Sequence, residues 1–189
     1  MLTANLVEGG IHFGLGATLA FRQADLHAIG GFAAIADYLA DDYELGRRIC
    51  ARKKVQLSAA VVKTHLADYD LQGFISHQLR WVRTIRASRP GGYAGMLLTF
   101  TLPWALATLL LSNVHGWSVA LLAVAVAFRG SMAVVSSRFV LREDDLRALW
   151  LLPVRDVIAM AVWIAGWLGN TITWRGEKFT LKDGKIERS

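Results

Sequence analysis

Three carboxylates stand together in the segment Ala40-Asp41-Asp42-Tyr43-Glu44-Leu45-Gly46. At the start of a helix, such side chains cap free backbone N–H groups and complement the helix dipole. In a cleft, a carboxylate can instead act as a general base, taking the proton of a hydroxyl as that hydroxyl attacks. The spacing alone favours capping, and the catalytic interpretation stays open beside it.

A second cluster, His77-Gln78-Leu79-Arg80-Trp81, begins a row of basic side chains. The row continues at three-residue spacing with Arg83, Arg86 and Arg89. Such a stripe can bind anionic lipid head groups, at roughly 1 kcal/mol per basic residue. Alternatively, Arg80 can neutralise a phosphate-bearing leaving group, because a guanidinium binds phosphate oxygens through two parallel hydrogen bonds. Trp81 would then supply a flat apolar wall. Local chemistry alone favours the lipid interpretation.

The remaining polar motifs indicate no metal site. Asp68-Tyr69-Asp70 has the form of a metal-binding Asp-x-Asp, but we expect a loop or a helix start there. Glu143-Asp144-Asp145 is more simply a solvated loop or helix cap. The histidines show no metal-ligand spacing with Cys50 or with each other, namely His12, His27, His65 and His115.

The first 89 residues are typical of a mixed α/β segment that positions these clusters. Periodicity predicts helices over 23–29, 38–54 and 70–86, with Gly30-Gly31 closing the first. Short strands are expected at 17–21 and 55–62, where β-branched and apolar residues gather. Both clusters then lie on helices, the first at a helix start.

Two apolar stretches follow, Tyr93–Leu111 and Trp117–Val135. Each is long enough for the ~30 Å hydrocarbon core of a bilayer at about 1.5 Å per helical residue. The connector 112–116 lacks Lys and Arg, whereas arginines flank the pair on both sides. The positive-inside rule therefore predicts a helical hairpin with cytoplasmic flanks and an outer connector.

A third apolar stretch, 148–168, is interrupted by Pro153, Arg155 and Asp156. Either the two charges pair inside a helix bundle, or the segment lies in the interface or re-enters the membrane. We expect a span, although it would place the basic tail outside, against the positive-inside rule.

Composition agrees with a soluble-looking part joined to a membrane part. The chain has 189 residues and a net charge of +6, with a pI of about 9.8 and a mean hydropathy of +0.36. Residues 90–128 carry no Asp, Glu, Lys or Arg. This pattern excludes a disordered chain, a disulfide-built secreted domain and an ordinary cytosolic enzyme. Positive-inside bias already explains the basic residues, so we expect no nucleic-acid partner.

The order of these features resembles the C-terminal half of family 21-type membrane glycosyltransferases. That family includes ceramide glucosyltransferase and the bacterial hopanoid-associated enzymes, which are relatives of processive GT-A glycosyltransferases. The matching pieces are Gly16-Ala17-Thr18-Leu19-Ala20-Phe21-Arg22, Ile29-Gly30-Gly31-Phe32, Asp41-Asp42-Tyr43-Glu44-Leu45-Gly46, His77-Gln78-Leu79-Arg80-Trp81, the hairpin, and Trp174-Arg175-Gly176 with Phe179. The resemblance covers nearly the whole chain, and the order and spacing of the pieces carry it.

The resemblance implies that Asp42 is the general base, with Asp41 as the first residue of the family's acidic dipeptide. Arg80 and Trp81 correspond to the Arg-Trp that serves the donor's diphosphate and the acceptor site. His77 stands where the family has Gln or Arg, and Gln78 follows it by one residue. Gly16 lies in a glycine-containing stretch near the acceptor site. We therefore expect His77, Gln78, Asp41 and Gly16 to be substrate-binding.

The same resemblance implies inverting sugar transfer from a nucleotide sugar, such as a UDP-sugar, to a ceramide- or hopanoid-type lipid hydroxyl. The expected fold begins with an α/β partial GT-A domain over 1–89, which includes an interfacial helix. Transmembrane helices follow within 90–174, at 93–111, 117–135 and 148–168. A polar tail over 175–189 ends the chain. The complete enzyme would use Mg²⁺ or Mn²⁺ to offset the charge of the leaving group, with ligands not in this chain. We expect this fragment alone to be inactive, multi-pass in a bacterial inner membrane, with its catalytic part cytoplasmic.

The rival hypothesis is a non-enzymatic small polytopic membrane protein or anchor subunit. Its basic segment would bind anionic lipid or a partner subunit. It predicts that Asp42 and Arg80 are dispensable as long as the hairpin and the net basicity remain.

Overall fold

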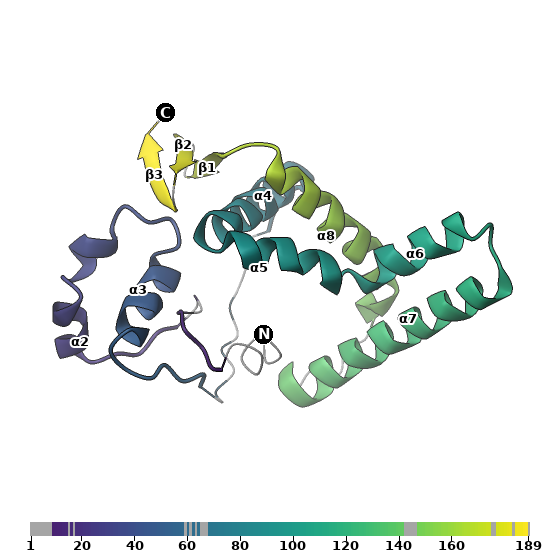
Figure 1. Cartoon of the computed structure of the whole chain (residues 1–189), viewed down its shortest axis with the longest axis horizontal. Coiled ribbons are helices and arrows are strands. Elements are labelled where there is room, and N and C mark those ends of the chain that lie inside the picture. The colour runs from purple at the N-terminus through teal and green to yellow at the C-terminus, as the bar shows by residue number, and fades with distance from the viewer. Residues whose placement is uncertain are drawn as a thin grey trace. The chain divides into compact units, whose positions relative to one another are not determined.

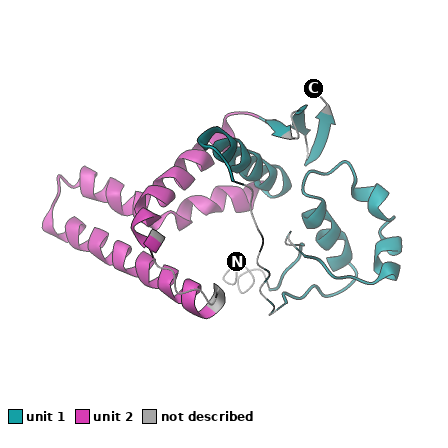
Figure 2. Ribbon diagram, turned by 180° about the vertical axis from the view of Figure 1, so that it is seen from behind, with its two compact units in different colours: residues 1–89, 170–189 teal, residues 90–169 magenta. Residues whose placement is uncertain are grey.

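The structure is a computed structural model that describes residues 9–14, 16, 18–58, 60, 62, 64, 68–141, 147–174, 177–182 and 184–188 (Figure 1). His65, the acidic run 143–145 and the pair 175–176 lie outside these residues. The chain divides into two compact units (Figure 2). Unit 1 comprises Met1–Arg89 with Asn170–Ser189, and unit 2 comprises Pro90–Gly169.

The helices of unit 1 confirm the three predicted from periodicity. The three are α2 (Gln23–Ala28), α3 (Asp41–Cys50) and α4 (Leu71–Ser88), and a short 3₁₀ helix that was not predicted, η1 (Phe32–Ile35), lies between α2 and α3. Gly30 and Gly31 close α2 with φ of 94° and 72°. Their N–H groups donate to the carbonyls of His27 and Leu26, so the glycines satisfy the helix end in a conformation that suits residues without a Cβ.

The two strands expected near the N-terminus are wrong within the described residues. Positions 18–21 and the described positions of 55–62 adopt no regular structure. The described strands all come from the C-terminus: β1 (Thr171–Trp174), β2 (Glu177–Lys182) and β3 (Lys185–Arg188), paired antiparallel in the order β1-β2-β3. A β-rich sequence becomes a strand only when another strand satisfies its backbone groups, and no described strand pairs with the described positions of these two segments.

The C-terminal sheet packs within unit 1. Ile172 and Leu181 are buried on its covered face, and α4 packs against β1 and β2. Ile186 N donates to Asp37 O at 2.8 Å, and the Lys185 ammonium lies 5.4 Å from the centre of the Tyr38 ring. The residues expected as a polar tail therefore form much of a sheet that joins α4 to the segment before α3.

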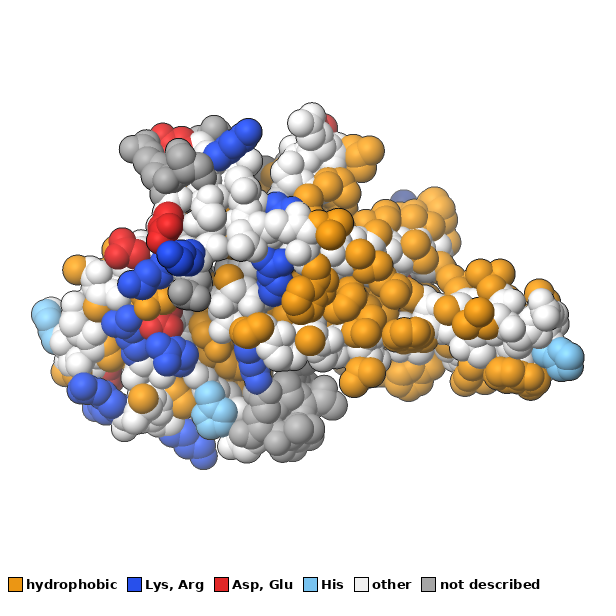
Figure 3. All heavy atoms as spheres, turned by 45° about the horizontal axis from the view of Figure 1, so that its top comes forward, with side chains coloured by type: hydrophobic (Ala, Val, Ile, Leu, Met, Phe, Trp, Pro, Cys, Tyr) orange, Lys and Arg blue, Asp and Glu red, His pale blue; other side chains and the backbone are white. Residues whose placement is uncertain are grey.

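All the regular secondary structure described in unit 2 is helical. In chain order it contains α5 (Pro90–Gly95), η2 (Met96–Thr99), α6 (Thr101–Leu111), α7 (Gly116–Val135), the π turn η3 (Ser136–Leu141), η4 (Arg147–Leu151) and α8 (Leu152–Trp167). Two continuous helical segments are long and apolar enough to span a membrane, Gly116–Phe139 and Leu149–Trp167. On the face seen in Figure 3, hydrophobic side chains cover these helices. The second and third predicted spans are thus helices of sufficient length.

The first predicted span is wrong as a single helix. Pro90–Thr99 and Thr101–Leu111 are bent by 56° about Phe100, whose ψ of 68° is not helical. Pro103 explains the break, because a proline ring clashes with the carbonyl four residues earlier, here that of Thr99. The helix therefore stops at Thr99, and α6 restarts so that Pro103 lies in its first turn.

A reciprocal pair of hydrogen bonds joins α5 to α8 inside unit 2. The Tyr93 hydroxyl donates to Trp163 O at 2.6 Å, and Trp163 Nε1 donates to Tyr93 O at 2.8 Å. Phe100 and Trp167 complete an aromatic cluster around this pair, with ring centres 5.2–6.0 Å apart. Both polar ends are satisfied, so these aromatic side chains can be buried at low cost.

An ion pair joins α7 to α8. Arg129 Nε and Nη2 donate to Asp156 Oδ2 and Oδ1 at 2.7 and 3.0 Å, and the Asp156 side chain is only 14 % exposed. Asp156 therefore pairs with an arginine of another helix, and Arg155, on the same helix, is exposed. Arg129 lies inside the second span and not in its flank.

We expect that removing one partner of this pair destabilises unit 2 strongly. Arg129→Ala and Asp156→Ala should each cost about 3–5 kcal/mol, because each leaves an unpaired charge in an apolar surrounding. The double variant Arg129→Leu with Asp156→Leu should recover most of the loss. The measurement is thermal unfolding of the purified protein in lipid nanodiscs. Arg155→Ala is the matched control and should unfold like the wild type, and equal losses in all three single variants would contradict the assignment.

Candidate functional site

The start of α3 leaves the side chain of Asp42 available. Ala40 occupies the cap position, and among the described residues no side chain caps this helix end. Asp41 Oδ1 accepts a hydrogen bond from Asp42 N at 2.9 Å, which holds the Asp41 carboxylate against the backbone of Asp42. The capping interpretation therefore fails for Asp42, although negative charge still complements the helix dipole.

Glu44, the third carboxylate of the cluster, has a structural role. It is 4 % exposed and accepts hydrogen bonds from Arg47 Nε and Nη2 at 2.8 Å and from Arg48 Nε at 2.7 Å. The hydrogen bonds from Arg47 hold the pKa of Glu44 below its ordinary value, against the opposing effect of burial. An anion held by two guanidinium groups is a poor proton acceptor, so Glu44 is not the base.

Glycines bring the loop 13–16 onto the first turns of α3. A Cβ on Gly46 would lie 1.9 Å from Gly14 N, and a Cβ on Gly14 would lie 2.1 Å from Asp42 O. Both distances are far below van der Waals contact, so only glycine fits either position. Gly16 lies beside the carboxylate itself, where a Cβ would come within 2.6 Å of Asp42 Oδ2.

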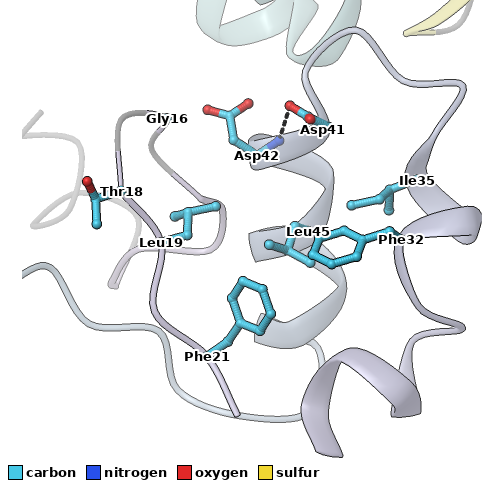
Figure 4. Close-up of a pocket in the computed structure, with 9 residues that line it drawn as sticks. All are labelled: Gly16, Thr18, Leu19, Phe21, Phe32, Ile35, Asp41, Asp42 and Leu45. Carbon is cyan, nitrogen blue, oxygen red and sulfur yellow. Dashed lines mark hydrogen bonds between the residues drawn. The ribbon is translucent and has the colours of Figure 1, made fainter. Parts of the chain in front are cut away.

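A pocket of about 260 Å³ opens where this loop meets α3 (Figure 4). Asp41 and Asp42 lie together at one end of it. The remainder is mostly apolar, lined by Leu19, Phe21, Phe32, Ile35 and Leu45, with Gly16 and Thr18. The rings of Phe21 and Phe32 meet edge to face, 6.3 Å apart. The arrangement is suited to a ligand with a hydroxyl at one end and an apolar body.

Of the second cluster, His77, Arg80 and Trp81 share one face of α4, because they are spaced three and four residues apart. His77 lies between two aromatic rings, 5.1 Å from Tyr69 and 6.0 Å from Trp81, measured between ring centres. Burial, and then the charge of Arg80, lower the pKa of His77, so its imidazole is neutral at physiological pH. Trp81 is 58 % exposed. Gln78 follows His77 on the same helix. An exposed indole backed by a neutral ring offers a flat binding surface.

The arginines that follow do not form the free basic stripe that the sequence suggested. Arg83 donates to Thr171 O, and Arg86 donates to Asn170 Oδ1. Arg89 lies over the Phe13 ring, 5.2 Å from its centre. Arg80 differs, since within the described residues its guanidinium has no hydrogen-bond or ion-pair partner. Three of the four arginines hold the fold together, and Arg80 is available for a ligand.

The structure thus groups Gly16, Asp41 and Asp42 in one place and His77, Gln78, Arg80 and Trp81 in another. Among the described residues, no hydrogen bond, ion pair or ring contact joins the two groups. Sequence reasoning missed the apolar lining of the pocket. Phe21 and Phe32 stand inside the matched motifs, where aromatic residues beside glycines were the available signal.

The metal motif considered in the sequence begins a helix. Asp70 caps α4, its Oδ1 accepting from Gly73 N at 2.7 Å, which confirms the expected helix start. Cys50 Sγ does lie 3.5 Å from His12 Nδ1, a contact that the spacing did not predict. No group of three or more His, Cys, Asp or Glu side chains could hold a metal ion within the part of the chain described.

The depressed pKa of Glu44 gives a pH-dependent test of its role. Glu44→Gln should cost about 1.5–3 kcal/mol near neutral pH, the range for hydrogen bonds to charged groups. A carboxyl with a lowered folded pKa stabilises the protein above its unfolded pKa of about 4.3, and that contribution is lost as pH falls through the folded value. The stability difference between wild type and variant should therefore be constant above about pH 5 and shrink below it. Chemical denaturation of both proteins from pH 7 to pH 3 measures this, and a difference independent of pH would contradict the charged hydrogen bond.

Comparison with known proteins identifies the group to which the chain belongs. The model of glycosyl transferase family 21 matches residues 1–187, nearly the whole chain. No curated protein and no solved structure matches it. Enzymes of such families transfer a sugar from a nucleotide-sugar donor to an acceptor, and a pocket with carboxylates at one end suits an acceptor hydroxyl. This chain, with its acidic pocket, its available arginine and its apolar helices, belongs to glycosyl transferase family 21.

Proposed function

We propose that the chain carries the acceptor side of an inverting, membrane-bound lipid glycosyltransferase, with Asp42 as the general base. The Asp42 carboxylate takes the proton of the acceptor hydroxyl while the hydroxyl oxygen attacks the anomeric carbon of the donor sugar. The bond from that carbon to the nucleotide diphosphate breaks, and its electron pair leaves with the diphosphate. A single displacement of this kind inverts the anomeric centre. The observation that carries the proposal is an Asp42 carboxylate that, among the described residues, neither caps its helix nor pairs with an arginine.

The pocket supports a lipid alcohol as acceptor. Its carboxylates occupy one end, and apolar side chains such as Phe21, Phe32 and Leu45 line the rest. A hydroxyl carried on an apolar body, as in a ceramide- or hopanoid-type lipid, would place its polar end at Asp42 and bury its adjoining carbons. Gly16 leaves the space at Asp42 Oδ2 that the hydroxyl needs, and Asp41 fixes the backbone of Asp42 through the hydrogen bond to its N–H.

Arg80 and Trp81 are assigned to the leaving diphosphate and the acceptor. A guanidinium without a protein partner can take two phosphate oxygens at once, and among the described arginines of α4 this applies to Arg80. Trp81 supplies an exposed flat surface, and His77 holds it from behind by ring stacking. Gln78, beside His77, would contribute a neutral hydrogen-bonding group.

Donor binding and metal binding are assigned outside these residues. The two carboxylates of the pocket do not make up a metal site by themselves, so no step here passes through Mg²⁺ or Mn²⁺. We propose that a GT-A donor-binding half holds a UDP-sugar and its metal at the cytoplasmic face, and that the 189 residues alone are inactive. Sugar transfer by the isolated chain would contradict this division.

The role of Asp42 is tested by Asp42→Asn in membranes where the complete enzyme transfers sugar to lipid. Loss of a general base should lower kcat by about 10²–10⁴-fold, because the hydroxyl then attacks without losing its proton. Protein level and thermal stability should stay at the wild-type values. Asp37→Asn, an exposed aspartate before α3, removes the same charge outside the pocket and should leave transfer unchanged. Near-normal transfer by Asp42→Asn would overturn the assignment and favour the non-enzymatic hypothesis.

The role of Arg80 is tested by Arg80→Lys and Arg80→Ala in the same assay. Lysine keeps the charge but loses the two-pronged contact, so transfer should fall in both variants and further in Arg80→Ala. Because the Arg80 guanidinium makes no hydrogen bond or ion pair with another described residue, neither variant should lower thermal stability. Arg86→Ala provides the contrast, since removing its bond to Asn170 should lower stability. A stability loss at Arg80 equal to that at Arg86 would contradict a ligand-binding role.

A further inference from the structure

Unit 1 combines residues that precede the apolar segment 90–169 in the sequence with residues that follow it. Residues before it and after it are joined by several independent contacts. Ile186 N donates to Asp37 O, Lys185 lies over the Tyr38 ring, and Arg83 donates to Thr171 O. These contacts need both parts in one aqueous compartment, since a folded unit cannot be divided by a bilayer.

It follows that the chain crosses the membrane an even number of times between Arg89 and Asn170. Three apolar segments lie in this interval: the bent pair Pro90–Thr99 with Thr101–Leu111, and the continuous spans Gly116–Phe139 and Leu149–Trp167. Three crossings would separate β1, β2 and β3 from the helices on which they pack. At least one of the three segments therefore does not cross.

The two continuous segments have the properties of crossing helices. Their 24 and 19 residues correspond to about 36 and 28 Å of helix, against a hydrocarbon core of about 30 Å. The ion pair between them fits an antiparallel hairpin. Arg129 lies about 15 Å before the end of its span, and Asp156 lies about 10 Å after the start of the next. Counted from the loop that joins the helices, the two charges reach similar depths.

The bent segment lacks these properties. Helix α6 has 11 residues, or about 16 Å, and the part before the bend is of similar length. Each half covers only about half of the hydrocarbon core. Its apolar side chains are nevertheless exposed, with Leu98 at 83 % and Leu111 at 85 %, so they need a lipid environment. A segment inserted into one leaflet provides it.

We propose that Pro90–Leu111 is a re-entrant segment that enters and leaves the membrane on the side of unit 1 and binds the lipid acyl chains of that leaflet. The connector 112–115 then lies on the side of unit 1, and the chain between the two continuous spans lies on the opposite side. This reverses the arrangement expected from the connector's lack of charge. The overall charge bias agrees with it, since nine Lys and Arg residues at 80–89 and 175–188 lie on the side of unit 1 and three at 138–147 lie at the other end of the spans.

Single cysteines test this topology without any activity assay. Cys50, the one native cysteine, is replaced by alanine in the full chain, and His115→Cys, Arg147→Cys and Lys178→Cys are added one at a time. Intact spheroplasts are treated with a membrane-impermeant maleimide before and after permeabilisation. Cysteines at 115 and 178 should behave alike, and the cysteine at 147 should show the opposite accessibility. Gln72→Cys on α4 is the control and should match 178.

Every other pattern overturns the proposal. If 115 is opposite to 178 and 147 is on the side of 178, the bent segment is a full span and Leu149–Trp167 does not cross. If 178 is opposite to 72, unit 1 is not one folded body and the even number of crossings fails. If His115→Cys disturbs the start of α7, Gly116→Cys serves as the second reporter, because a Cβ there meets nothing within 4 Å.

Discussion

The pocket depends on one backbone contact, the approach of the loop 13–16 to helix α3 at Gly14 and Gly46. No side chain fits between the two backbones, so the loop lies directly on the helix. That approach places Gly16 beside the Asp42 carboxylate and Leu19 beside Leu45, and it closes one side of the pocket. The charged side chains of α3 also divide into paired and available groups. Glu44 is held by Arg47 and Arg48 within the helix, whereas Asp42 has no arginine partner among the residues that the structure describes.

The basic side chains of α4 show the same division between structure and chemistry. Arg83 and Arg86 bind the backbone and side chain at the start of the C-terminal sheet, and they connect residues that are distant in sequence. Arg80 stands one turn earlier, and its guanidinium makes no hydrogen bond to the described residues of the sheet. A row of arginines at equal spacing therefore contains residues of two kinds, and only the position of the sheet distinguishes them. Because the chain belongs to glycosyl transferase family 21, we propose that Arg80 and the exposed Trp81 bind the substrates of sugar transfer.

Within unit 2, polar contacts determine which helices pair. Small residues let α6 approach α7, with Leu102, Ala105 and Ala125 buried between them. Close contact of small side chains is a usual basis of helix association in membranes. The ion pair between Arg129 and Asp156 holds α7 to α8, because its charges are stable in an apolar surrounding only while they remain together. The hydrogen bonds between Tyr93 and Trp163 hold the broken segment to α8 in the same way.

The sequence by itself determined the three longer helices of unit 1, the two continuous apolar helices of unit 2 and the family. These features depend on local periodicity, on segment length against membrane thickness, and on motifs read in order. Tertiary structure decided the rest. Whether Asp42 caps a helix or faces a pocket depends on a loop 26 residues away, at Gly16. Pro103 is visible in the sequence, but the position of the bend is not, because the segment is equally apolar on both sides of it. The partner of Asp156 is 27 residues away, and the residues that pack on α4 come from the other end of the chain. Contacts between distant residues are set by packing, and no local pattern records them.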